Sequence, residues 1–473
     1  MHYIPARKSL VLLSALCGAL SGGLRAETQG GLEAGAQEPR NQEPRTSARR
    51  EALERAAVET ERVETERNAN VTPQSPGLGA QTGPLRLVDL SLDIMGAAGV
   101  SSARDAELED LKGGGHDPKK RGFTLQQAEL SIAGAVDPWF QARAHIVTFL
   151  DAASGESVVE LEEAYVTTQQ LPFGLQGKFG TYLTEFGRLN STHPHAWDWQ
   201  DQPVMMTRLF GADGMRGPGA RLSWLLPSET FAELTFGVQN ANGETMTSFL
   251  ANEEVYEERA LGGRFFTPRE VRSGGDLVYS MRATTAFDVT DTHSAALGAS
   301  ALFGPNSTGN GASTAIYGVD AVWKWKAANA EQGYPFWKVQ AEFLVRDFEA
   351  EAQQDDADPL APVTLPGQTL HDYGGYVQGL YGFAVGWAAG VRVDWASGSG
   401  TSYDAEQQTF GRIDDPFRTD RVRISPMLAW KPSEFSRVRL QYDYDDSDHL
   451  EDPAHSVWLG FEVLIGAHPP HAY

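Results

Sequence analysis

The residues best suited to chemistry lie in one polar segment near the middle of the sequence. His193 and His195 flank a proline there, and Asp198 and Asp201 follow a few residues later. Imidazole and carboxylate groups bind zinc, but a zinc site in a protein usually has three or four protein ligands. The histidine pair is therefore a weak signal for a metal site, and zinc is the one cofactor that the sequence suggests.

A second weak pair of this kind, His468 and His471, lies near the end of the chain. Catalytic chemistry is not indicated. The sequence contains no GxSxG, HExxH or CxxC motif, so it predicts no catalytic residue and no enzyme. The formal net charge of -24, from 39 basic and 63 acidic residues, argues against nucleic-acid binding, which requires a basic surface.

Alternating apolar and polar residues indicate that β-strands surround the segment that carries these side chains. In SRVRLQYDYDD, residues 436–446, one face carries valine, leucine and tyrosine, and the other carries arginine, glutamine and aspartate. Residues 232–239, 336–346 and 387–395 repeat the pattern. A period of two is typical of a β-strand with one apolar face. That face packs on the core of a soluble sheet, whereas in a membrane barrel it contacts lipid.

The connections between these segments favour the membrane barrel. Short turns alternate with long polar connections, as in a barrel with periplasmic turns and external loops. The pattern predicts an all-β fold, a transmembrane antiparallel up-and-down barrel of about 16 strands that begins at residues 86–94 and ends at residues 456–466. Tryptophans gather beside the short turns, as an interfacial girdle requires. They are Trp139, Trp224, Trp323, Trp325, Trp337, Trp387 and Trp430.

The polar face of each predicted strand would then look into the lumen. So many charged side chains could not fill a dry core, and they fit a water-filled interior. The cations are interleaved with acidic residues, so both signs of charge are expected there. The predicted lumen-facing residues are Arg143, Lys178, Arg221, Arg282, Arg346, Arg392, Arg421, Arg423, Arg437, Arg439, Asp394 and Asp443.

The chain before the barrel has two predicted parts. Residues 1–26 have a basic start, an apolar stretch and an end of small residues, which is the pattern of a secretory signal peptide. Residues 27–84 contain no aromatic residue and are rich in charged residues. This composition predicts a disordered tail, in which residues 47–68 could form a short helix. The barrel is assigned to residues 85–473.

The segment that carries His193 is the third long connection of the predicted barrel. In general porins this connection folds into the lumen and narrows it. The alternative is that its histidines and aromatic rings only brace it against the barrel wall. The residues that would form a constriction are Arg188, His193, His195, Trp197, Asp198, Trp199, Asp201 and Arg208.

Three segments resemble the opening strands of the phosphate-selective porin O and P family: RGFTLQQAELSIAGAVDPWFQARAHIVTFLD, VELEEAYVTT and LPFGLQGKFGTYLTEFGRLNSTH. The resemblance covers about the first third of the barrel and implies a 16-stranded trimeric porin. Phosphate selectivity in that family goes with a ladder of lumenal arginine and lysine, whereas acidic residues are interleaved here. The segment FGRLNSTHPHAWDWQDQP also resembles proteins labelled zinc-regulated TonB-dependent outer membrane receptors.

The predicted function is a porin-like channel for passive passage of small polar or charged solutes across the outer membrane of a Gram-negative-type bacterium. The alternative is a zinc-linked outer-membrane receptor or binding barrel, although no plug domain is predicted before the barrel. The expected partners are membrane lipid, lipopolysaccharide and small solutes. The family resemblance also implies that the protein assembles as a homotrimer.

Overall fold

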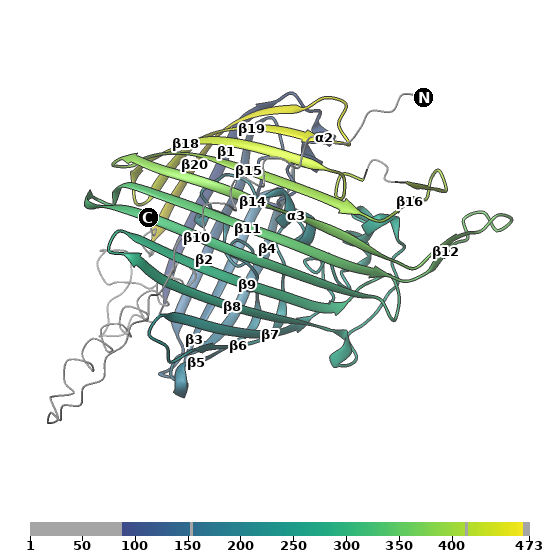
Figure 1. Cartoon of the computed structure of the whole chain (residues 1–473), viewed down its shortest axis with the longest axis horizontal. Coiled ribbons are helices and arrows are strands. Elements are labelled where there is room, and N and C mark those ends of the chain that lie inside the picture. Colours follow the sequence, from purple (N-terminus) through teal and green to yellow (C-terminus); the bar gives the residue numbers. More distant parts are fainter. Residues whose placement is uncertain (1–87, 152–154, 412–414, 467–473) are drawn as a thin grey trace, which may run out of the picture. The chain divides into compact units, whose positions relative to one another are not determined.

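The computed structural model describes residues 88–151, 155–411 and 415–466. Its main element is a closed barrel of antiparallel strands (Figure 1). The first strand pairs with the last, with Ser101 opposite Ser456, so the barrel has no free edge. The prediction of an all-β, 16-stranded up-and-down barrel is confirmed. The predicted signal peptide, the tail, and His468 and His471 lie outside the described residues.

The strands follow one another around the barrel in chain order. They are β1 (Asp89–Ser101), β2 (Gly122–Ala135), β3 (Phe140–Leu150), β4 (Ser157–Thr168), β5 (Leu175–Leu183), β6 (Arg216–Leu225), β7 (Phe231–Asn240) and β8 (Leu277–Thr290). The second half comprises β9 (His293–Pro305), β10 (Ser313–Glu331), β11 (Tyr334–Ala350), β14 (Gln368–Ala384), β15 (Trp387–Ser399), β18 (Arg421–Ser433), β19 (Ser436–Ser447) and β20 (Ala454–Gly466).

Short and long connections alternate along the chain, as predicted. The short ones include residues 291–292 between β8 and β9 and residues 385–386 between β14 and β15. Two of the long ones form hairpins, β12 with β13 and β16 with β17, which project from one end of the barrel in Figure 1. No helix among the described residues is long and apolar enough to cross a membrane. The elements of the long connections are α2 (Asp105–Leu111), α3 (Val204–Phe210), α4 (Glu253–Glu258), β12 (Gln353–Asp355), β13 (Val363–Leu365), β16 (Ser402–Asp404) and β17 (Thr409–Gly411).

The outward face of the barrel strands is apolar. In β18, Val422 and Ile424 are exposed, whereas Arg421 and Arg423 beside them are buried. Tryptophans near the short turns also face outward, and Trp387 stacks on Trp430 of the neighbouring strand with ring centroids 5.7 Å apart. An apolar surface of this extent is favourable in lipid, where tryptophan prefers the interface. The surface is that of a membrane-spanning barrel of the outer-membrane type.

The barrel interior holds a hydrophobic core as well as charged groups. All residues of α3 are buried, as expected for an apolar helix surrounded by protein. The helix packs with inward-facing strand residues such as Leu302, Ile316 and Leu344. The predicted water-filled lumen is therefore corrected for this region, where buried apolar side chains pack together. The long connections carry apolar side chains, and packing inside the barrel removes these side chains from water.

Candidate channel constriction

Residues 184–215 join β5 to β6 and fold into the barrel interior. The ends of this segment are tied together, because the Thr184 amide donates to the Met215 carbonyl at 2.8 Å. Asn190 strengthens the closure: its Nδ2 donates to the Thr184 carbonyl at 2.8 Å, and its Oδ1 accepts from the Met215 amide at 2.8 Å. We call this closed segment the inner loop. It contains all the residues that the sequence suggested for a constriction.

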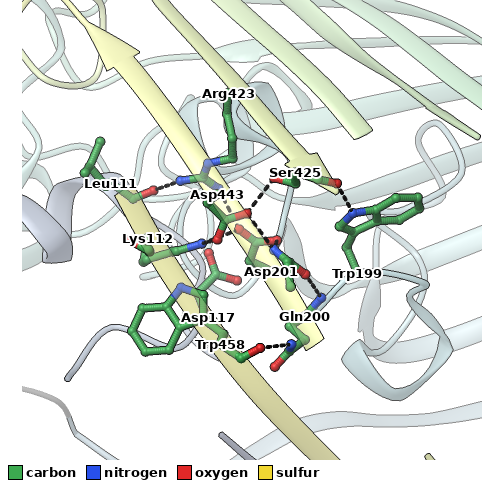
Figure 2. Close-up of polar contacts among 12 residues, drawn as sticks. Leu111, Lys112, Asp117, Trp199, Gln200, Asp201, Arg423, Ser425, Asp443 and Trp458 are labelled. Atoms are coloured by element: carbon green, nitrogen blue, oxygen red, sulfur yellow. Dashed lines mark hydrogen bonds and ion pairs between the residues drawn. The ribbon is translucent and has the colours of Figure 1, made fainter. Parts of the chain in front are cut away.

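Asp201 of the inner loop lies in a buried charge cluster, part of which is shown in Figure 2. Its Oδ2 accepts from Lys112 Nζ at 2.6 Å and from Arg423 Nη1 at 2.7 Å. Its Oδ1 accepts from Arg392 Nη2 at 2.9 Å. Lys112 also donates to Asp443 Oδ2 at 2.6 Å. We call these five residues the Asp201 anchor, because they fix the inner loop to the barrel.

The Asp201 anchor joins the first long connection, the inner loop and three strands of the wall, β15, β18 and β19. Lys112 follows α2 in the first long connection, Asp201 belongs to the inner loop, and Arg423 is on β18. Burial alone would raise the pKa of Asp201, but the three neighbouring cations outweigh burial and hold the pKa well below its usual value. A buried ion pair is stable only when its charged atoms are well bonded. This condition is met at Asp201, where each carboxylate oxygen accepts two hydrogen bonds.

The tryptophans of the inner loop sit against the same part of the wall. The Trp199 indole donates to the Ser425 carbonyl at 2.8 Å and is 1% exposed. The backbone carbonyls of Trp197 and Trp199 accept from Arg437 Nη1 at 2.8 Å and Arg439 Nη1 at 2.9 Å, respectively. Both the side chains and the backbone of the loop are thus fixed, which agrees with the bracing alternative for these aromatic residues.

Three other residues predicted for the constriction reach separate parts of the wall or of a neighbouring connection. The contacts are the Arg188 amide to Glu342 Oε2 at 2.9 Å, the Asp198 carboxylate to Lys338 Nζ at 3.0 Å, and Arg208 Nη2 to the Thr419 carbonyl at 2.6 Å.

The histidines of the inner loop meet a different part of the wall, formed by β2 and β4. His193 Nε2 lies 2.9 Å from Glu163 Oε2. His193 Nδ1 lies 2.9 Å from Glu162 Oε2 and 3.4 Å from Glu129 Oε2. His195 Nδ1 lies 3.3 Å from Glu129 Oε2. We call these five residues the His193 anchor.

Two further groups border the His193 anchor. His145 of β3 has its Nδ1 2.8 Å from Glu129 Oε1, and its ring centroid is 4.4 Å from that of His193. Asp93 of β1 has its Oδ2 3.7 Å from His195 Nδ1. The aspartates that follow the histidines in the sequence, Asp198 among them, lie elsewhere, so the carboxylates around the histidines all come from the wall.

Glu162 and Glu163 are neighbours in the sequence, yet both are buried inside the barrel. The cause is a β-bulge in β4: His145 pairs with Glu163 and Ile146 pairs with Leu161, which leaves Glu162 without an opposite residue. Strict alternation would have placed only one of the two glutamates inside. This pair is not among the site residues predicted from the sequence, although adjacent glutamates in an otherwise alternating strand are a signal of the bulge.

The charge balance of the His193 anchor is acidic. Burial alone would lower the pKa of His193, but Glu129 and Glu162 outweigh burial and raise the pKa well above its usual value. The pKa of His195 is also raised, against the effect of burial, chiefly by Glu129. The site therefore attracts positive charge.

The residues predicted to face the lumen are all buried. Most of the cations among them form ion pairs with neighbouring carboxylates. Examples are Arg282 with Asp320 at 2.7 Å and Arg346 with Asp372 at 2.7 Å. The full set is Arg143, Lys178, Arg221, Arg282, Arg346, Arg392, Arg421, Arg423, Arg437, Arg439, Asp394 and Asp443.

Two residues of the first long connection were missed by the sequence analysis. Lys112 belongs to the Asp201 anchor, and Asp117 Oδ1 accepts from the backbone amide of Gln202 in the inner loop at 2.9 Å. A signal existed, because Leu108 and Leu111 of α2 form an apolar face that is unusual in an external loop. That face packs with Trp458 of β20 inside the barrel.

Cavities border the inner loop. One, of about 40 Å³, is lined by Asp198, Lys338, Lys431 and Arg437 together with apolar and aromatic side chains. Another, of about 20 Å³, has Glu162 in its lining together with Pro194 and Trp197 of the loop. Each has room for only a few water molecules, and both cavities have charged groups in their walls.

The fold and these contacts define a class: a transmembrane β-barrel of the outer-membrane type whose interior is narrowed by its own connections. No family model matches the chain. An uncharacterized protein of Aquifex aeolicus (strain VF5) is 27% identical over 412 residues, which cover 82% of this chain and 80% of that protein.

Solved structures similar to the chain include two outer-membrane proteins. The outer membrane channel DcaP of Acinetobacter baumannii is 12% identical with a TM-score of 0.48, covering 80% of this chain and 97% of that chain. The anion-selective porin from Comamonas acidovorans is 11% identical with a TM-score of 0.47, covering 80% and 99%, respectively. The phosphate-selective porin O and P family stays a resemblance of the sequence.

Proposed function

We propose that the protein is a porin-like channel through which small polar or charged solutes cross the outer membrane passively. The observation that carries the proposal is the distribution of residues on the closed barrel, with apolar side chains outside and charged side chains inside. A soluble barrel would have the opposite distribution. A membrane barrel with a polar interior provides a path for solutes that lipid excludes.

The inner loop limits the proposed passage to small solutes. It is fixed to the wall at the Asp201 anchor and at the His193 anchor, so it does not simply swing aside. Solutes would pass beside it, where the cavities with Lys338 and Glu162 in their walls have room for only a few water molecules. We therefore expect a narrow channel of low conductance.

The pairing of the inward charges predicts weak ion selectivity. Each of Arg221, Arg282 and Arg346 forms an ion pair with a carboxylate at 2.7 Å, so little positive charge is left to attract anions. A phosphate-selective pore would need a ladder of unpaired cations. We infer that the protein discriminates by size more than by the sign of the charge.

A liposome-swelling assay tests the proposed function. Refolded protein in liposomes should admit small sugars and amino acids of either charge, at rates that fall steeply with solute size. In a salt gradient, the reversal potential should lie close to zero. Heat-unfolded protein is the control. The proposal is wrong if folded protein leaves the liposomes as impermeable as the control does.

The topology of the channel can be tested on intact cells. We propose that the long connections are external and the short turns periplasmic. A tag near Asp355, in a long connection, should be labelled from outside, and a tag near Ser433, at a short turn, should not. The opposite labelling pattern would reverse the orientation. Chemical cross-linking of the same cells would test the homotrimer that the family resemblance implies.

The zinc-linked receptor is the second candidate function. The observation in its favour is the His193 anchor, which gathers imidazole and carboxylate groups inside the barrel. A receptor would bind its ligand without forming a pore, so liposomes that stay impermeable while the protein binds metal would favour it over a channel.

A further inference from the structure

We propose that the His193 anchor binds one divalent transition-metal ion of the zinc class, through Glu129, Glu162, His193 and His195. The ion would join the inner loop to β2 and β4. The proposal rests on the arrangement of these side chains and does not depend on channel activity.

The distances between the donor atoms match a small tetrahedral centre. Zinc lies about 2.0–2.2 Å from nitrogen and oxygen ligands, which places two tetrahedral ligands roughly 3.3 Å apart. Glu129 Oε2 lies 3.4 Å from His193 Nδ1 and 3.3 Å from His195 Nδ1. Glu162 Oε2 lies 2.9 Å from His193 Nδ1. Each of the four atoms is therefore close to at least one other at the separation that a common ion would give them.

His193 and Glu129 each have a second polar atom, on the side away from the proposed ion, that already has a hydrogen-bond partner. Glu163 Oε2 accepts from His193 Nε2 at 2.9 Å, which leaves Nδ1 of that ring to face the other two glutamates. Glu129 Oε1 is 2.8 Å from both Ser131 Oγ and His145 Nδ1, which leaves Oε2 for the histidines of the loop. Histidine ligands of metals are commonly oriented in this way by a carboxylate on the other ring nitrogen. Carboxylate ligands are in turn held by hydrogen bonds, and we assign His145 to that positioning role at Glu129.

Several buried polar atoms at the site have no hydrogen-bond partner among the described residues. They include Glu162 Oε2, His193 Nδ1 and both carboxylate oxygens of Asp93, which is 3% exposed. Leaving such atoms unbonded is unfavourable, because they lose their hydration without gaining a hydrogen bond. Glu162 Oε2 and His193 Nδ1 are only 2.9 Å apart but are not in hydrogen-bond geometry. A shared cation would satisfy both atoms.

The backbone holds the two histidines in a suitable arrangement before any ion binds. Residues Pro194–Ala196 form one turn of 3-10 helix, closed by the Ala196 amide donating to the His193 carbonyl at 2.9 Å. The imidazole rings of His193 and His195 are nearly parallel, 13° apart, with centroids 5.7 Å apart. Both rings can thus present Nδ1 to Glu129. A mixed set of nitrogen and oxygen donors favours zinc-class ions over calcium or magnesium.

Isothermal titration of the full-length, EDTA-treated barrel with Zn²⁺ tests the proposal. We expect one equivalent bound per chain. Glu162→Gln and His195→Gln each remove a ligand with little change in volume, and each should weaken binding at least tenfold. Co²⁺ added to the wild type should give the intense visible absorption of a tetrahedral centre, and this absorption should be lost in both variants.

The matched control is His371→Gln. His371 also lies beside a carboxylate, Asp347, at 2.7 Å, but it is half-exposed and outside the anchor. This variant should bind Zn²⁺ like the wild type. Heat-modifiable migration on a gel shows that each variant has folded. Absence of Zn²⁺ binding in the wild type would overturn the proposal. Binding that persists unchanged in both ligand variants would also overturn it, because other histidines, such as His468 and His471, would then hold the ion.

Discussion

The Asp201 anchor and the His193 anchor both attach the inner loop to the barrel wall, but they do so with different chemical groups. At the Asp201 anchor, lysine and arginine meet carboxylates, and both oxygens of Asp201 are fully bonded. At the His193 anchor, carboxylates meet histidines, and Glu162 and His193 keep buried atoms without a hydrogen bond. The first anchor carries its own cations. We expect the second, which gathers three glutamates, to depend on a proton or a metal ion from solution, and we therefore call the first attachment permanent and the second conditional.

Removing the charge of Asp201 should have the largest effect. Asp201→Asn leaves Lys112, Arg392 and Arg423 buried with one carboxylate fewer, and we expect the free energy of unfolding to fall by about 3–5 kcal/mol. Urea unfolding of the refolded barrel measures the change. Asp347→Asn, at an exposed pair, is the control and should be close to neutral. A small effect of Asp201→Asn would mean that the permanent attachment lies elsewhere.

Zinc should raise the free energy of unfolding through the His193 anchor and not through the Asp201 anchor. At a free Zn²⁺ concentration of 100 times Kd, binding adds about 2.7 kcal/mol to the free energy of unfolding. Thermal unfolding with and without Zn²⁺ should show the gain in the wild type and in Asp201→Asn, if that variant still folds. In Glu162→Gln the gain should disappear. An equal gain in Glu162→Gln would remove the distinction between the two anchors.

Acid should weaken the permanent anchor only at low pH. The folded-state pKa of Asp201 is lowered, so its charge contributes stability above the unfolded pKa of about 3.9 and the contribution is lost as the pH falls toward the folded value. The difference in unfolding free energy between wild type and Asp201→Asn should therefore stay constant from pH 8 to pH 5. It should shrink progressively below about pH 4. A difference that already declines between pH 8 and pH 5 would disagree with this assignment.

The smallest effect is expected for Glu162→Gln without metal. This change removes one of several neighbouring carboxylates and so relieves repulsion, but it also removes a contact of His193. We expect the two effects to nearly cancel, with a change of less than about 1 kcal/mol in unfolding free energy. Urea unfolding in EDTA measures it. A loss as large as that of Asp201→Asn would show that the histidine side is also a permanent attachment.

The strands and their two faces could be predicted because the alternation of β18 and β19 is enforced by lipid on one side and polar groups on the other. Contacts inside the barrel could not be predicted in this way. Lys112 and Asp201 are 89 positions apart, and no local pattern joins them. Leu302 and Ile316 are apolar although they face inward, because they pack with α3, and strand periodicity does not reveal this packing.

Single-channel recording in planar bilayers shows directly whether the barrel is a channel narrowed by its anchored inner loop. Wild-type protein should give small, discrete conductance steps. Asp201→Asn, checked for folding by heat-modifiable migration, should give larger or more variable steps because the loop is less firmly held, and Asp347→Asn should match the wild type. Absence of steps in folded wild-type protein, or identical steps in Asp201→Asn, would contradict the account.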